Sequence, residues 1–215
     1  MYSCNYDGTL SIHDKSSLLE LAVLDVGQNP DGLATMNGKV YVSNSGGLNA
    51  PTYDSTMTII DANDDSVIST LTTRVNCTDL IAGINNDLYL NSRGDYAGVA
   101  PAMLRIDSEV DTIQYEFPVD ITSWDYDEGW LYYVDADLNG VYRYSTLTNT
   151  FESIQLIDCS TFNTPYTIEV TSDRIYLVDA NSYVNSSTVN VYDKTGGFQF
   201  DFTAGLNATD FVFND

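Results

Sequence analysis

Few side chains in the sequence have the types and spacing that acid–base catalysis requires. His13 is the only histidine, and it lies beside Asp14. A catalytic triad would also need a serine or cysteine nucleophile close to that histidine, and the chain has no GxSxG motif. We therefore interpret His13 as a structural residue, and we predict a non-enzymatic protein with no catalytic residue and no cofactor.

Metal chemistry has one candidate segment, DADLNG at 135–140. Asp135, Asp137 and Asn139 stand at alternate positions before Gly140, as in the first half of a calcium-binding loop. The twelfth position holds Thr146 instead of the glutamate that would bind the ion through both oxygens. A tight hairpin turn is the favoured interpretation, and no metal site is predicted.

The composition excludes several kinds of partner. The 215 residues include 31 acidic and 8 basic side chains, for a net charge of −23. This balance argues against nucleic acid and anionic membranes as partners. No apolar run approaches the ~20 residues of a membrane span, and the first residues lack a signal-peptide pattern. Cys4, Cys77 and Cys159 form no CxxC motif and fit small buried residues better than a zinc site.

A repeated tyrosine organises the chain. It occurs in MYSCN, VYVSN, LYLNS, LYYVD and IYLVD, at Tyr2, Tyr41, Tyr89, Tyr132 and Tyr176. Each copy reads as a strand and is followed by a second apolar strand, a polar turn and a third strand. A period near 43 residues with about four short strands is typical of β-propeller blades. A sandwich of short strands would explain the strand lengths, but not one tyrosine in one local context.

The repeat sets the predicted blade boundaries. In the best copy, GLATM is an innermost strand, Asn37-Gly38 a hairpin turn and KVYVSN the second strand. The final segment LNATDFVFND matches an innermost strand, so we expect it to complete the first blade. We predict one all-β propeller domain over 1–215, or a fragment of a larger ring such as a seven-bladed one. Its blades would span 206–215 with 1–27, 28–74, 75–119, 120–158 and 159–205.

The residues of the second blade also carry a family resemblance. "NPDGLATMNGKVYVSNSG…STMTIIDANDDSVISTL" resembles the YVTN-type β-propeller repeat. It is most like the surface-exposed YVTN/YncE-like propellers of Bacteroidota, which are commonly exported lipoproteins. The resemblance implies export to the cell surface or periplasm of a Gram-negative bacterium. It also implies a possible corrinoid (cobalamin) ligand and an outer-membrane transporter as partner protein.

The predicted binding face combines the loops between blades, which supply Phe162 and Tyr166, with the loops between second and third strands. Three are long, at 44–56, 91–101 and 179–188, and each carries one tyrosine. Aromatic rings with polar tips among asparagines suit a sizeable neutral, polar ligand such as a corrinoid or a glycan. The predicted ligand-binding residues are Tyr53, Tyr96, Tyr183, Phe162, Tyr166, Asn49 and Asn181.

Two other classes of function remain open. A glycoside-hydrolase-like propeller would need paired carboxylates near the ring centre, and the innermost strands supply Asp31, Asp79, Asp125 and Glu169. A structural protein-interaction module would need no ligand site. The preferred prediction is a non-enzymatic binding protein.

Overall fold

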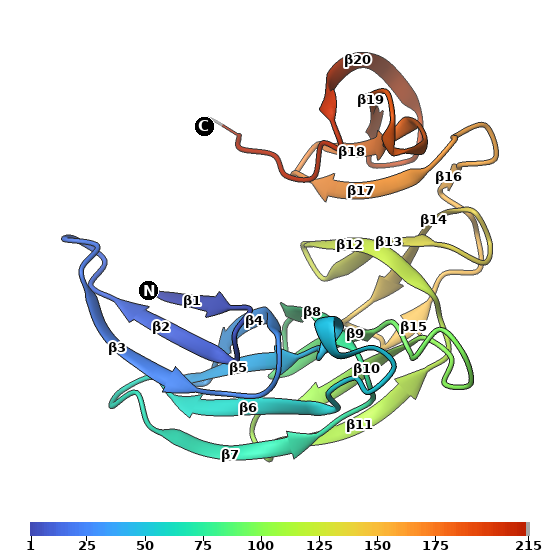
Figure 1. Ribbon diagram of the computed structural model, residues 1–215. Coiled ribbons are helices and arrows are strands. Elements are labelled where there is room, and N and C mark those ends of the chain that lie inside the picture. Colours follow the sequence, from blue (N-terminus) through green and yellow to red (C-terminus); the bar gives the residue numbers. More distant parts are fainter. Residues whose placement is uncertain (214–215) are drawn as a thin grey trace. The chain divides into compact units, whose positions relative to one another are not determined.

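The computed structural model describes residues 1–213, and strands make up nearly all of their regular structure (Figure 1). Five antiparallel sheets follow one another along the chain. The predicted all-β fold of about five short-stranded blades is confirmed by these sheets. The chain divides into two compact units, residues 1–119 and residues from 120 on, and each is described separately.

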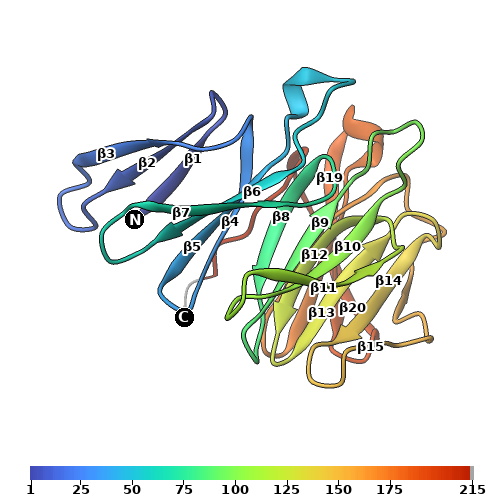
Figure 2. The same ribbon diagram turned by 90° about the horizontal axis from the view of Figure 1, so that it is seen from below.

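The first unit contains three sheets in the order of the chain. Figure 2 shows the strands of the third sheet running side by side. Their strands are β1 (Tyr2–Asn5), β2 (Thr9–His13) and β3 (Glu20–Asp25); β4 (Pro30–Met36), β5 (Lys39–Asn44), β6 (Thr56–Asp61) and β7 (Val67–Thr72); and β8 (Cys77–Ala82), β9 (Asp87–Ser92), β10 (Ala102–Asp107) and β11 (Thr112–Phe117). A short 3-10 helix, η1 (Gly47–Asn49), lies in the β5–β6 loop.

The second unit contains two sheets and a second short helix, η2 (Asn181–Tyr183). The strands are β12 (Ile121–Asp127), β13 (Trp130–Asp135), β14 (Gly140–Ser145), β15 (Thr150–Phe151) and β16 (Ile157–Asp158); and β17 (Pro165–Val170), β18 (Arg174–Asp179), β19 (Ser186–Asp193) and β20 (Phe198–Leu206). The repeat pattern predicts a single third strand over TFESIQL (150–156), but only its first two residues form a strand, β15; β16 follows the segment, and both pair with β14. Polar residues interrupt it, and Ile154 between them is exposed.

Turn chemistry sets the hairpins. Asn37 and Gly38 join β4 to β5 in a two-residue loop and have φ angles of 52° and 72°. A type I′ turn requires positive φ at both central residues, which asparagine and glycine tolerate best. The predicted Asn37-Gly38 hairpin is therefore confirmed.

The second strand of a blade is buried on both faces. Val40 and Val42 of β5 pack with Leu10 of the first sheet, while Tyr41 between them packs with Leu90 and Leu104 of the third. Successive side chains of a strand point to opposite faces, so apolar residues must occupy both. Within the first unit, neighbouring blades thus bury one another, as in other repeat architectures.

In the first two sheets, the structure shows what the hydroxyl of the repeated tyrosine does. The Tyr41 hydroxyl donates a 2.7 Å hydrogen bond to Asp111, in the last turn of the next sheet. Tyr2 donates a 2.7 Å bond to Asp65, at the corresponding turn of the second sheet. Asp65 and Asp111 both have left-handed backbones, with φ of 59° and 53°. The tyrosine ring fills the core while its hydroxyl joins one blade to the next.

The second unit uses the same position differently. Its two sheets bury a common core that includes Tyr132 of β13 and Ile175 and Leu177 of β18. The ammonium group of Lys194 lies 4.5 Å from the centre of the Tyr132 ring and 2.6 Å from the carboxylate of Asp127. Here a cation–π contact and an ion pair join the sheets in place of the tyrosine–aspartate bond.

The predicted closing strand at 206–215 is not formed in the described part of it. Residues 207–213 contain no strand, β20 already includes Leu206, and the first sheet has three strands. The rings of Phe211 and Phe213 lie 5.6 and 5.0 Å from that of Tyr176. In the first unit, Leu33 of innermost strand β4 shares an apolar cluster with Tyr2 of the preceding sheet in the same way. The last two positions of the prediction, 214 and 215, lie outside the described residues.

Candidate functional site

The polar residue that ends each repeated strand anchors a loop. Asn44, at the end of β5, is fully buried. Its side-chain oxygen accepts a 3.1 Å hydrogen bond from the Gly27 amide, and its nitrogen donates to Thr56 and Thr58 of β6. A Cβ atom at position 27 would collide with the Asn44 side chain, so the close approach requires glycine. Asn44 therefore fixes the loops at one end of this sheet.

A second asparagine fixes the connection into the next sheet. Asn29 is buried and left-handed, with φ of 46°. Its side chain donates to the Tyr6 carbonyl at 2.7 Å and accepts from the Leu48 amide at 3.0 Å. Asn76 has the same left-handed backbone before β8 and donates to the Gly94 carbonyl at 3.1 Å. These bonds tie the long loops to rigid strands, so the loop face is held in place.

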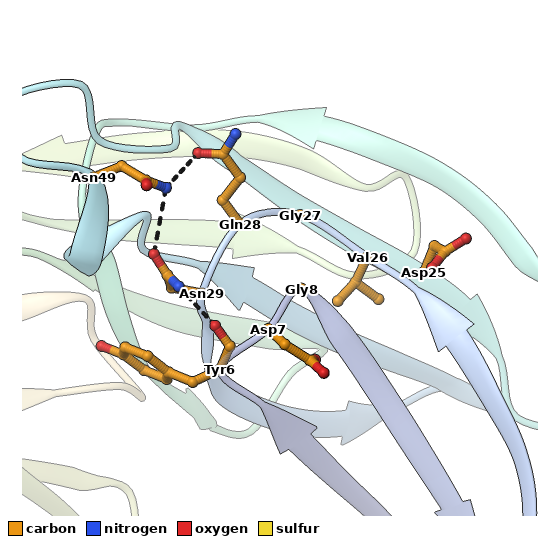
Figure 3. Close-up of a pocket in the computed structure, with 9 residues that line it drawn as sticks. All are labelled: Tyr6, Asp7, Gly8, Asp25, Val26, Gly27, Gln28, Asn29 and Asn49. Atoms are coloured by element: carbon orange, nitrogen blue, oxygen red, sulfur yellow. Dashed lines mark hydrogen bonds between the residues drawn. The ribbon is translucent and has the colours of Figure 1, made fainter.

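A polar pocket of about 490 Å³ opens among these loops in the first unit (Figure 3). Three segments supply its walls: the β1–β2 turn, the connection after β3, and η1. The lining residues are Tyr6, Asp7, Gly8, Asp25, Val26, Gly27, Gln28, Asn29 and Asn49. The volume is within the range of small-molecule sites, and Asn49 is one of the predicted site residues.

Tyr53 and Tyr96 meet on the same unit. Their ring centres are 6.1 Å apart at an interplanar angle of 70°, an edge-to-face contact between the β5–β6 and β9–β10 loops. Tyr96 is 71% exposed and has a left-handed backbone with φ of 57°. One oxygen of Asp95 accepts hydrogen bonds from the amides of Ala97, Gly98 and Val99, which hold the loop and keep the Asp95 pKa below its ordinary value.

Tyr166 and Tyr183 form a second pair in the second unit. Their ring centres are 5.3 Å apart and nearly perpendicular, at 87°. Asn181, Ser182 and Tyr183 have positive φ in succession, at 47°, 61° and 61°. Such conformations are uncommon for tyrosine and cluster at functional sites. The structure thus presents one such aromatic pair in each unit. Three of the rings lie on the predicted loops, whereas Tyr166 lies at the start of strand β17.

The other predicted residues have mainly structural contacts. Phe162 packs against the core of the second unit. The Asn181 side chain donates to the Ser186 carbonyl and the Thr188 hydroxyl, and accepts from Asn163. Asn49 donates to Gln28 at 2.6 Å. Nothing in the structure tests their binding roles, so all seven residues stay predictions.

A feature that the sequence did not signal is a bulge in the first strand of each four- or five-stranded sheet. The register shifts between Pro30 and Leu33, Cys77 and Leu80, Ile121 and Ser123, and Pro165 and Ile168. Bulges re-aim side chains and are frequent beside functional sites. Asp31, Asp79 and Tyr166 lie within these shifts. The alternation of apolar residues could not reveal them, because the strands are apolar on both faces.

The carboxylates of the innermost strands influence one another electrostatically within each unit. Desolvation raises the pKa of the Asp31 carboxyl, Arg93 opposes the shift, and Asp79 adds to it. Desolvation also raises the pKa of Asp125, against hydrogen bonds from the amides of Val170 and Tyr126 and a side-chain bond with Glu169. The predicted carboxylates therefore have neighbours of the kind that acid–base chemistry uses.

The DADLNG segment is a hairpin turn between β13 and β14, where Asp135 pairs with Gly140. Asp135 accepts a 2.9 Å hydrogen bond from the Leu138 amide within the turn. Residues 1–213 contain no group of three or more His, Cys, Asp or Glu side chains that could hold a metal ion. In the same residues, no helix has the length and apolar character needed to cross a membrane.

Comparison with known proteins bears on the fold. No family model and no curated protein matches the chain. Similar solved structures include the hydrazine synthase of Kuenenia stuttgartiensis (TM-score 0.71, 15% identity, 89% of this chain and 60% of that one). BamB from Moraxella catarrhalis is similar with a TM-score of 0.60 and 12% identity, over 94% of this chain and 57% of that one. The computationally designed Ika8 protein is similar with a TM-score of 0.63 and 13% identity, over 100% of this chain and 74% of that one.

These similarities and the five sheets define the class: the chain has a β-propeller fold, and its sheets are blades. The chain spans 60% of the hydrazine synthase chain and 57% of the BamB chain. At 12–15% identity, the similarity concerns the fold alone. Function must be argued from the site.

Proposed function

We propose that this propeller is a non-enzymatic binding protein that holds a polar ligand on its loop-bearing face. The observation that carries the proposal is the pair of edge-to-face tyrosine contacts, Tyr53 with Tyr96 and Tyr166 with Tyr183. In each pair the more exposed ring belongs to a tyrosine with a left-handed backbone conformation, Tyr96 or Tyr183. Stiff aromatic surfaces with a polar tip lose little entropy on binding and are common binding anchors.

The ligand classes we propose are a corrinoid or a glycan. Both are polar and large, and both present apolar surface beside many hydrogen-bonding groups. Tyrosine rings and the amides of Asn49 and Gln28 suit such ligands. A neutral ligand also tolerates the protein's net charge of −23.

We further propose that the protein is exported and acts at the cell surface or in the periplasm of a Gram-negative bacterium. The support is the resemblance of residues 28–74 to YVTN-type propellers of Bacteroidota. A corrinoid-binding protein in that location would pass its ligand to an outer-membrane transporter. Localisation of the tagged full-length protein by cell fractionation tests this, and a cytoplasmic protein would contradict it.

A glycoside hydrolase is the second candidate function, and one observation favours it. Asp125 and Glu169 share a side-chain hydrogen bond, and the pKa of Asp125 is raised by desolvation. A glycosidase needs two carboxyl groups with different proton affinities. The binding proposal is preferred because the exposed aromatic pairs are explained by it directly.

Titration of the native chain distinguishes the two functions. We expect saturable binding of cobalamin or of an oligosaccharide in isothermal titration calorimetry, with the ligand recovered unchanged by chromatography. Glycoside turnover that is lost in Glu169→Gln would establish the hydrolase instead. A folded protein that binds none of the corrinoid and oligosaccharide probes would contradict the binding proposal.

A further inference from the structure

The pocket of the first unit has an unusual charge for a site of its size. Asp7 and Asp25 line it, and none of its nine lining residues is lysine, arginine or histidine. One oxygen of Asp7 accepts from the amide and the hydroxyl of Thr9, at 3.2 and 2.7 Å. Within residues 1–213 the other Asp7 oxygen and the exposed Asp25 carboxylate have no hydrogen-bond partner. The pocket therefore offers two carboxylates, which point in different directions in Figure 3, to separate cationic groups.

The opposite wall offers hydrogen bonds to a neutral group. Asn49 donates to the Gln28 side-chain oxygen at 2.6 Å (Figure 3). This bond leaves the Gln28 side-chain nitrogen to donate and the Asn49 side-chain oxygen to accept, a combination that suits a hydroxyl group. Tyr6, which is 47% exposed, adds an aromatic ring to the same pocket. Carbon-bound hydrogens pack well against such a ring.

The walls are held in place before any ligand arrives. The Gln28 amide donates to Asp54 at 2.8 Å, and the Gln28 carbonyl accepts from Gly46 at 2.8 Å. Asn29 joins the Tyr6 turn to η1 through its buried side chain. A pocket with its walls fixed costs less ordering entropy on binding.

We propose that this pocket binds protonated amino sugar units of a saccharide. The amine of one sugar unit contacts Asp7 and that of a neighbouring unit contacts Asp25, the hydroxyl groups bond with Gln28 and Asn49, and an apolar ring face packs on Tyr6. The net charge of −23 draws a cationic saccharide toward the surface. This inference rests on the proposed binding function and names the ligand class for one part of that face.

The probes are a glucosamine tetramer and its fully N-acetylated counterpart, which differ in the charge of the amine. At a mildly acidic pH that keeps the amine protonated, we expect the glucosamine tetramer to bind at least about tenfold more tightly. Asp7→Asn and Asp25→Asn should each weaken its binding about tenfold, because each removes a charge-assisted hydrogen bond. Asparagine at position 7 keeps the oxygen that accepts from Thr9, so the turn is retained.

The matched control is Asp64→Asn, the same change of charge in the β6–β7 turn, where Asp64 accepts from the Ser66 amide. It should leave the affinity unchanged, and circular dichroism should show all three variants folded. Equal weakening in Asp64→Asn would reveal general charge attraction and overturn the proposal. Equal binding of the two tetramers would also overturn it, while leaving the loop-face function intact. If neither tetramer binds, the proposal is wrong, and cobalamin and neutral-glycan titrations still test the function separately.

Discussion

Replacing Tyr41 by alanine is expected to lower the free energy of unfolding by about 3–5 kcal/mol, as for other buried aromatic side chains. Tyr41 is fully buried between the second and third sheets of the first unit. The substitution would leave a cavity and also remove the hydroxyl that donates to Asp111. Lys39, 2.7 Å from Asp111, would still neutralise that carboxylate.

Tyr41→Phe separates the two contributions. It keeps the ring and removes only the hydrogen bond to the carboxylate, so we expect a loss of about 1.5–3 kcal/mol. The control is Val110→Ala, a substitution at an exposed position next to Asp111. It should change the free energy of unfolding by no more than about 0.5 kcal/mol. The stability of all three variants is measured by urea unfolding followed by circular dichroism. Tryptophan fluorescence is less suitable because both tryptophans, Trp124 and Trp130, lie in the second unit. A phenylalanine variant as stable as the native protein would show that the tyrosine–aspartate bond does not join the blades.

Raising the pH above 9 is expected to destabilise the protein strongly. Burial raises the thiol pKa of Cys4 and Cys77 to about 11 and of Cys159 to about 12, from an ordinary value of 9.0. Desolvation and the bond to Asp65 raise the pKa of Tyr2 to about 12. These groups hold their protons more tightly in the folded state, so their stabilising effect is complete below pH 9 and is lost as the pH rises through 11 to 12.

The size of this effect can be bounded from one buried thiol. Cys77 is fully buried, and a shift of that size corresponds to on the order of 2 kcal/mol of unfolding free energy by pH 11. Urea unfolding at pH 8, 9, 10 and 11 should show a steady fall above pH 9. In Cys77→Ala the fall should be shallower, although the variant starts from a lower stability. A flat profile across this range would contradict the burial of the three thiols.

The repeated tyrosine made the fold predictable. Tyr41 and Tyr89 occupy the middle of a second strand, opposite Ile59 and Arg105 of the third. Because one residue type recurs at a fixed position of the strand, the repeat period could be identified, and the period predicted the blades. Asn37-Gly38 fixed a hairpin by its backbone preferences alone. These features depend on local chemistry, which a sequence displays directly.

The features that the sequence did not predict depend on contacts between distant segments of the chain. The hydrogen bond from Tyr41 to Asp111 joins residues 70 positions apart, and the sequence around either residue does not predict it. Phe211 matched an innermost strand in its pattern, yet residues 207–213 contain no strand. A repeat pattern states which residues can form a strand, whereas the choice of partner depends on which apolar surface is available.

The candidate site was predictable only in part. Loop length and aromatic content pointed to Tyr53 and Tyr96, and these rings do meet. The pocket of the first unit was missed because its carboxylates come from the short β1–β2 turn and the end of β3. Asp7 and Asp25 look like ordinary turn and strand-end residues, and only the fold brings them to one pocket.

The central claim, that the loop face binds the ligand, is tested most directly by substituting its two exposed tyrosines. Tyr96→Gly and Tyr183→Gly are suitable changes because glycine accepts the left-handed backbone of both positions. Tyr115→Ala removes an exposed ring from outer strand β11 and serves as the control. The measurement is the dissociation constant of the tightest-binding corrinoid or oligosaccharide by calorimetry. We predict that at least one glycine variant loses ~2 kcal/mol of binding free energy, about thirtyfold in affinity, while Tyr115→Ala binds normally. Unweakened binding by both folded glycine variants would contradict the account.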